Sequence, residues 1–121
     1  MSGEKAIPWC LEAHHDARGS LVVVEARRDI PFEIERVFYV YGVPEGASRG
    51  GHAHRVCQQL LVCVSGYCRV VAGGDEFWLT GPDKALYVPP GVRLDLDHWH
   101  PGTVLMVLCS HYYAEEDYIH E

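Results

Sequence analysis

The stretch GASRGGHAHRVCQQLLVCVSG, residues 46–66, decides the fold of this chain. Its two histidines, His52 and His54, lie two positions apart, which is the repeat of a β-strand, so both side chains point to the same face. The apolar run at 60–64 and the turn at Ser65-Gly66 predict one arm of a hairpin, with residues 67–72 as the other arm. The stretch therefore predicts a β-protein with two histidines on one strand face.

Short apolar or alternating runs continue on both sides of this stretch at intervals of about ten residues, separated by turn residues. This spacing is typical of an all-β sandwich or barrel. We expect strands over residues 6–12, 20–25, 36–41, 52–54, 59–64, 67–72, 76–80, 85–88 and 104–110. We also expect a short helix or a tail over 114–120, and a single domain over 1–121, because no linker or repeat interrupts the pattern.

Composition limits the possible partners. The chain has 121 residues, of which 48% are apolar and 22% charged, as in an ordinary globular protein. Its formal net charge of −7 argues against a nucleic-acid partner, which requires a basic face. Its apolar runs are too short to cross a membrane, and residues 1–8 show no secretory signal. We therefore expect a cytoplasmic protein with neither a nucleic-acid nor a membrane partner.

The five cysteines, at positions 10, 57, 63, 68 and 109, are odd in number and mostly lie within apolar runs. In a chain without an export signal, this pattern favours reduced, buried thiols over a disulfide framework.

The spacing around the histidines matches a known motif. Five residues separate Gly46 from His52, four separate His54 from Gln59, and six separate Gln59 from Gly66. This pattern resembles the first motif of the cupins, with Gln59 in place of the usual Glu. The resemblance implies an all-β fold of the cupin (RmlC-like) type, a jelly-roll barrel whose interior receives both imidazoles.

The second cupin motif is incomplete. Pro89-Pro90-Gly91 supplies its turn, but Leu94 occupies the position of a third metal-binding histidine. A divalent metal site of the usual kind takes three or four His or carboxylate ligands, so two imidazoles bind a metal weakly, and we expect no metal cofactor. A metal-dependent cupin and a pair of hydrogen-bonded core histidines remain alternatives. We favour an acid–base pair in a ligand cavity.

Five segments carry a more specific resemblance. They are RVFYVY at 36–41, RGGHAH at 49–54, DARGSL at 16–21, QLLVCVSGYCRV at 59–70 and YYAEEDYI at 112–119. Together they resemble the sugar 3,4-ketoisomerases that act on thymidine-diphosphate (dTDP) 4-keto-6-deoxyglucose. The resemblance implies a cytoplasmic enzyme of deoxysugar biosynthesis that uses no cofactor, binds a dTDP-linked keto-deoxysugar and forms a homodimer with exchanged N-terminal strands.

The resemblance also implies site residues. The catalytic candidates are His52, His54 and Tyr39, and Arg49 is the family's site arginine. Such enzymes move a carbonyl from C4 to C3 of the hexose through an enediol, a reaction that needs a proton removed from one carbon and returned to its neighbour. Arg36 is a candidate for the diphosphate, and Gln59 for a sugar hydroxyl. Strand alternation places Tyr39 opposite Arg36, so a regular strand cannot turn both into one cavity.

Some positions depart from the family pattern. Arg93-Leu94 stands where members often have Trp-His, and Gly51 stands where they often have an aromatic residue. These departures leave open the substrate and the configuration at C4 of the product. Two alternatives therefore stay open beside the ketoisomerase: a related nucleotide-sugar epimerase or dehydratase, and a non-catalytic module that binds a sugar nucleotide.

Overall fold

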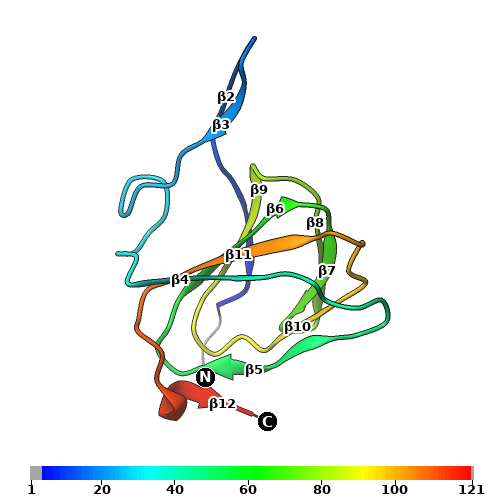
Figure 1. The fold of residues 1–121 in the computed structure, drawn as a ribbon. Helices are drawn as coiled ribbons and strands as arrows, with labels where there is room; N and C mark the ends of the chain where they lie inside the picture. Colours follow the sequence, from blue (N-terminus) through cyan, green and yellow to red (C-terminus); the bar gives the residue numbers. More distant parts are fainter. Residues whose placement is uncertain (1–3, 121) are drawn as a thin grey trace.

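Two five-stranded antiparallel sheets form the body of the protein in the computed structural model, which describes residues 4–120 (Figure 1). The first sheet has the order β1-β9-β6-β11-β4 and the second the order β12-β5-β10-β7-β8. The strands of the first sheet are β1 (Ile7–Cys10), β9 (Lys84–Val88), β6 (Gln59–Ser65), β11 (Val104–Cys109) and β4 (Arg36–Val40). Those of the second are β12 (Tyr118–Ile119), β5 (Arg49–His54), β10 (Leu94–Asp97), β7 (Cys68–Ala72) and β8 (Asp75–Leu79). This arrangement confirms the predicted all-β jelly roll.

The main core lies between the two sheets. Strand alternation supplies it: on β7, Cys68, Val70 and Ala72 are buried, whereas the intervening side chains are only partly so. Leu61 of β6 and Val107 of β11 face them from the first sheet and belong to the same cluster. The interior between the sheets is therefore largely apolar.

A second apolar cluster covers the outer face of the first sheet. Leu60 and Val62 of β6 point away from the barrel interior, and Ile30 and Phe32 of the long connection between β3 and β4 pack over them. Ile30 is 2% exposed and Phe32 is 3% exposed. Because β6 is covered on both faces, its sequence is a continuous apolar run rather than an alternating one.

A separate two-stranded hairpin extends beyond the barrel. It is formed by β2 (Ala13–Asp16) and β3 (Gly19–Val22) and points away from both sheets (Figure 1, blue). Leu21 on this hairpin is 56% exposed.

The structure differs from the sequence expectations in several elements. The strand expected over 6–12 ends at Cys10, the strand expected over 20–25 ends at Val22, and residues 13–16 form β2, which was not predicted. Strand β10 was also not predicted. The tail contains only a three-residue 3-10 turn, η1 (Glu115–Asp117), which leads into the two-residue strand β12. In residues 4–120, no helix has the length and apolarity that a membrane crossing requires.

Gly50 allows β5 to pass close to β10. Its φ is +91°, and a Cβ built on it would lie 2.7 Å from the backbone oxygen of Leu94. The register between β5 and β10 shifts between Leu94 and Asp95. A side chain at position 50 would separate the strands at the point where the register of His52 is set.

Candidate active site

A cavity of about 160 Å³ lies between the sheets, beside β5. Its polar wall contains Arg49 and His52 of β5, Gln59 of β6, Trp99 and Tyr118 of β12. Its apolar wall consists of Phe38, Val40, Leu61, Leu94, Leu96, Leu105 and Val107. An apolar pocket with a few converging polar groups is the usual form of a small-molecule site.

The two predicted histidines lie side by side at this cavity. His52 pairs with Leu94 of β10, and His54 pairs with Tyr118 of β12. Their ring centroids are 5.3 Å apart in an edge-to-face arrangement. His52 lines the cavity, whereas His54 is 5% exposed and lies behind His52 and Tyr118. The shared face predicted from their spacing is confirmed.

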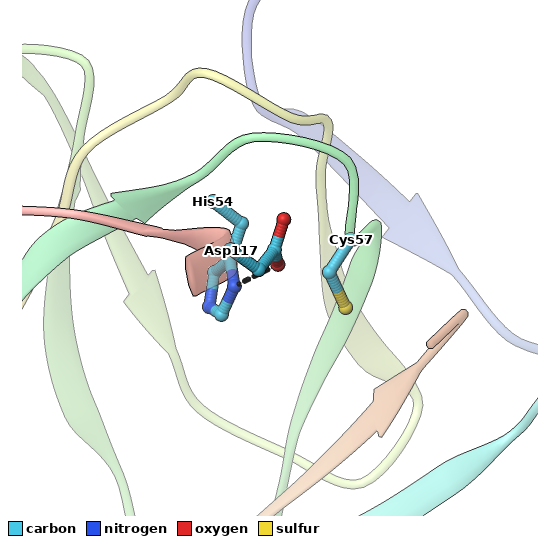
Figure 2. A group of neighbouring side chains, drawn as sticks. All are labelled: His54, Cys57 and Asp117. Carbon is cyan, nitrogen blue, oxygen red and sulfur yellow. Dashed lines mark hydrogen bonds and ion pairs between the residues drawn. The ribbon is translucent and has the colours of Figure 1, made fainter. Parts of the chain in front are cut away.

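Asp117 fixes the orientation of His54. The His54 Nδ1–H donates a hydrogen bond to Asp117 Oδ2 at 2.8 Å (Figure 2). The Val56 N–H donates to Asp117 Oδ1 at 2.8 Å. Burial acts to raise the pKa of Asp117, but these hydrogen bonds outweigh it and hold the pKa below its usual value. With Nδ1 donating to a carboxylate, Nε2 carries the lone pair; Nε2 is buried and has no partner among the described residues.

The environment of His52 favours the neutral ring. Burial and the neighbouring His54 lower the pKa of His52, and a backbone hydrogen bond to Gly50 only partly opposes them. A neutral imidazole in the cavity wall is able to accept a proton.

Tyr118 completes the site from the C-terminal tail. Its ring centroid lies 4.5 Å from that of His52 and 4.6 Å from that of His54. The sequence reasoning assigned no role to Asp117 or Tyr118. The resemblance at 112–119 was the one available signal, because nothing in the local pattern indicates that this tail meets β5.

Gln59 and Leu94 occupy the positions where metal-binding cupins have ligands. Both line the cavity, and Gln59 is 5% exposed, so its predicted inward orientation is confirmed. A neutral amide and an apolar side chain at these positions suit a sugar better than a metal ion.

The other predicted residues are distributed differently. Arg49 lines the cavity. Arg36 shares a strand face with Phe38 but is not part of the cavity wall; its guanidinium carbon lies 5.4 Å from the Phe38 ring centroid. Tyr39 differs from the expectation, because strand alternation turns it to the opposite face, where it is 64% exposed and pairs with Met106. The structure does not bring Tyr39 to the histidines.

A buried thiol lies beside the His54–Asp117 pair. Cys57 is 2% exposed and follows β5 in the chain (Figure 2). A hydrogen bond from the Cys109 thiol holds the pKa of Cys57 below its usual value, although burial opposes this. All five cysteines are free thiols, and four are buried as expected, but Cys10 is exposed.

Comparisons with known proteins agree with this geometry. The family model described as FdtA (WxcM-like, C-terminal) matches residues 7–121. The TDP-4-oxo-6-deoxy-alpha-D-glucose-3,4-oxoisomerase of Aneurinibacillus thermoaerophilus is 42% identical over 110 residues, which are 88% of this chain and 79% of that protein.

Solved structures show the same likeness. The 3,4-ketoisomerase QdtA from Thermoanaerobacterium thermosaccharolyticum, in complex with TDP, has a TM-score of 0.92 and 33% identity over 96% of this chain and 88% of its own. A variant of QdtA in which a histidine is replaced by asparagine, in complex with TDP-4-keto-6-deoxyglucose, has a TM-score of 0.89 and 33% identity over 96% of this chain and 87% of its own.

A more distant match extends the comparison of folds. The Mycobacterium tuberculosis rmlC epimerase has a TM-score of 0.81 at 19% identity, over 98% of this chain and 69% of its own, and it shows a shared fold alone. The family model and the 42% identical relative confirm the resemblance that the sequence predicted. The chain belongs to the FdtA (WxcM-like, C-terminal) family, the cupin-fold sugar 3,4-ketoisomerases.

Proposed function

We propose that this protein moves the carbonyl of a dTDP-linked 4-keto-6-deoxyhexose from C4 to C3. The observation that carries the proposal is the pair of neighbouring imidazoles, His52 in the cavity wall and His54 held by Asp117 at 2.8 Å. Relatives that act on this class of substrate or bind TDP support the choice of substrate.

Proton transfer by the imidazole pair is sufficient for the reaction. A neutral imidazole removes the proton from C3, and the electron pair of that C–H bond forms the C3=C4 double bond of an enediolate whose negative charge lies on the C4 oxygen. The C4 oxygen then takes up a proton and the C3 hydroxyl gives one up, and delivery of a proton to C4 leaves the carbonyl at C3. Every step is a proton transfer, so no redox cofactor is required. The negative charge on the enediolate oxygen needs donors, and Arg49, Tyr118 and Trp99 stand in the cavity wall. The Trp99 Nε1–H is buried and has no partner among the described residues, so it is available to donate.

The cavity suits the hexose rather than the whole nucleotide sugar. Its volume of about 160 Å³ is below the range of roughly 300–1,000 Å³ of sites that enclose a drug-sized ligand. We infer that the hexose enters the cavity while the nucleotide remains outside. Arg49 is exposed at the cavity, and neither Arg49 nor Arg36 forms an ion pair with another described residue, so both are available for the diphosphate.

We further infer a homodimer in which the β2–β3 hairpin of each chain packs on its partner, and a cytoplasmic location. The hairpin points away from its own barrel with Leu21 exposed, as a dimerisation arm requires (Figure 1). Five free thiols suit a reducing compartment.

Isotope exchange tests the proposed reaction. Incubated in deuterated water with dTDP-4-keto-6-deoxyglucose, the protein should release the 3-keto sugar with deuterium at C4, and substrate re-formed by the reverse reaction should carry deuterium at C3; NMR detects both. His54→Asn should reduce the rate by roughly 10²- to 10⁴-fold. If the product is epimerised but keeps its carbonyl at C4, the protein is an epimerase. Binding of TDP with neither exchange nor product would contradict any catalytic role.

A further inference from the structure

We propose that His54, Cys57 and Asp117 form a zinc-binding site whose occupation blocks the imidazole pair. One ligand atom from each of these side chains lies within 4.8 Å of the others (Figure 2). His54 ends β5, Cys57 lies in the connection after it, and Asp117 belongs to η1, which the fold brings beside them; none of the three lines the cavity. This site shares His54 with the cupin metal position but not its other residues, since Cys57 and Asp117 stand in place of His52, Gln59 and Leu94. The binding claim stands apart from the proposed function, on which only the expected inhibition rests.

The donor set selects the metal. An imidazole nitrogen, a thiolate sulfur and a carboxylate oxygen are the three ligand types that Zn²⁺ takes in proteins. Three protein ligands leave one tetrahedral position for water. The carboxylate and thiolate carry two negative charges with a neutral imidazole, which balance the charge of Zn²⁺. That balance matters because His54, Cys57 and Asp117 are 5%, 2% and 9% exposed.

Small side-chain movements make the geometry tetrahedral. With bonds of about 2.0–2.3 Å, ligand atoms around zinc lie roughly 3.3–3.8 Å from one another. His54 Nδ1 and Asp117 Oδ2, now 2.8 Å apart, must separate slightly, and the sulfur of Cys57 must approach them. The ion then takes the place of the Nδ1 proton between His54 and Asp117, the neutral ring carries its proton on Nε2 instead, and the proton of the Cys57 thiol passes to solvent.

The tail provides the route of entry. Asp117 and Tyr118 belong to a segment that pairs with β5 through only two residues, Tyr118 with His54 and Ile119 with Ala53 (Figure 1). Hydrogen bonds from the Arg55 N–H to Asp117 O at 2.7 Å and from the Val56 N–H to Asp117 Oδ1 at 2.8 Å also hold the segment. A strand pairing of two residues is nevertheless shorter than the other pairings of the barrel, so we expect this segment to open before they do. Asp117 moves with the segment, which uncovers His54 for the incoming ion.

Cobalt spectroscopy tests the site directly. Co²⁺, which replaces Zn²⁺ in such sites, should give the wild-type protein a thiolate-to-cobalt band in the near ultraviolet and the visible bands of a tetrahedral ion. Cys57→Ser should abolish the thiolate band. Two matched controls should keep it: Cys63→Ser, which alters another buried thiol, and Cys10→Ser, which removes the exposed one. No band in the wild type, or a band lost in Cys10→Ser instead, would overturn the proposal.

A second measurement needs no variant. Zn²⁺ added to wild-type protein should shift the imidazole ¹⁵N signals of His54 but not those of His14 or His15 on the exposed hairpin. Unchanged His54 signals would likewise overturn the site, even if Cys57→Ser failed to fold.

Inhibition connects the site to catalysis. Zn²⁺ should inhibit the isomerase, and a chelator should restore its activity. Cys57→Ser should raise the zinc concentration that gives half-maximal inhibition by at least about tenfold. The same variant should leave the rate without zinc unchanged. If the protein binds cobalt through Cys57 but never turns over the keto sugar, the proposed function fails and the site stands. If the enzyme is active but cobalt produces no thiolate band, the site fails alone.

Discussion

At the scale of single residues, the His54–Asp117 contact determines which nitrogen of His54 is basic. Asp117 accepts the Nδ1 proton at 2.8 Å and is itself held by the Val56 N–H. A carboxylate in this position orients the ring and stabilises the imidazolium that forms when Nε2 takes up a proton. Asp117 is thus a positioning residue that acts through His54.

Replacing Asp117 by Asn should separate this role from substrate binding. The amide can donate to Nδ1, which would favour the tautomer with the proton on Nε2. We expect Asp117→Asn to lower kcat by roughly 10²- to 10⁴-fold with little change in KM. Steady-state kinetics with the keto sugar measures both, and Asp117→Glu is the control that retains the charge. An increase in KM with kcat unchanged would contradict the positioning role.

The sequence predicted some site residues because their positions follow from a local rule. His52 and His54 share a face through the two-residue period, and Gln59 points inward by the same rule along β6. The two-residue alternation of side chains along a strand also predicted that Tyr39 and Arg36 face opposite ways, and the structure confirms it. Asp117 was missed because its contact with His54 spans 63 positions, which no local pattern encodes.

At the scale of the strands, the close passage of β5 along β10 sets the register of His52. Gly50 has a φ of +91° and Gly74, in the turn between β7 and β8, has a φ of +90°. Both backbones therefore disfavour a side chain to a similar degree. They differ in surroundings, because a Cβ at Gly50 meets Leu94 O at 2.7 Å, whereas nothing lies within 4 Å of a Cβ at Gly74.

This pair of glycines offers a matched comparison. Gly74→Ala should lower the free energy of unfolding by about 1 kcal/mol, the strain of a left-handed non-glycine residue. Gly50→Ala adds a backbone clash and should cost roughly 1–3 kcal/mol more. Urea unfolding of both variants measures the difference. Equal losses in the two variants would show that β5 and β10 separate without penalty.

The barrel strands were largely predictable, whereas β2, β10 and the tail were not. Strand β10 spans only residues 94–97 and follows the Pro89-Pro90-Gly91 turn. A segment this short is not long enough for an alternating pattern to be recognised. The tail forms β12 only because β5 offers it an edge. Such pairing arises from tertiary contact rather than from local preference.

At the scale of the whole molecule, the β2–β3 hairpin is the feature that a monomer leaves unexplained. An isolated two-stranded hairpin is marginally stable in water, and this one presents an exposed Leu21. Packing against a second copy would bury that surface and support the hairpin. The remaining expectation, a single domain over 1–121, stays a prediction.

A charge on the hairpin should therefore dissociate the dimer. Size-exclusion chromatography with light scattering measures the mass in solution. Wild-type protein should have twice the chain mass of 13.6 kDa. The Leu21→Glu variant should have the mass of a single chain, because an ionised carboxylate is costly to bury. Val64→Glu, which alters a 42% exposed valine on β6, should remain dimeric. A monomeric wild type would contradict the exchanged-strand dimer.

The 63-position separation between His54 and Asp117 also has a consequence for folding kinetics. Strands β1 and β9, and β4 and β11, likewise join segments that are distant in the chain. Chains dominated by such non-local pairings fold slowly, typically in milliseconds to seconds, because loop entropy is lost before contacts compensate for it. The carboxylate of Asp117 reaches His54 only when the C-terminal tail pairs with β5. We therefore expect full activity to appear late in folding, after the tail has docked.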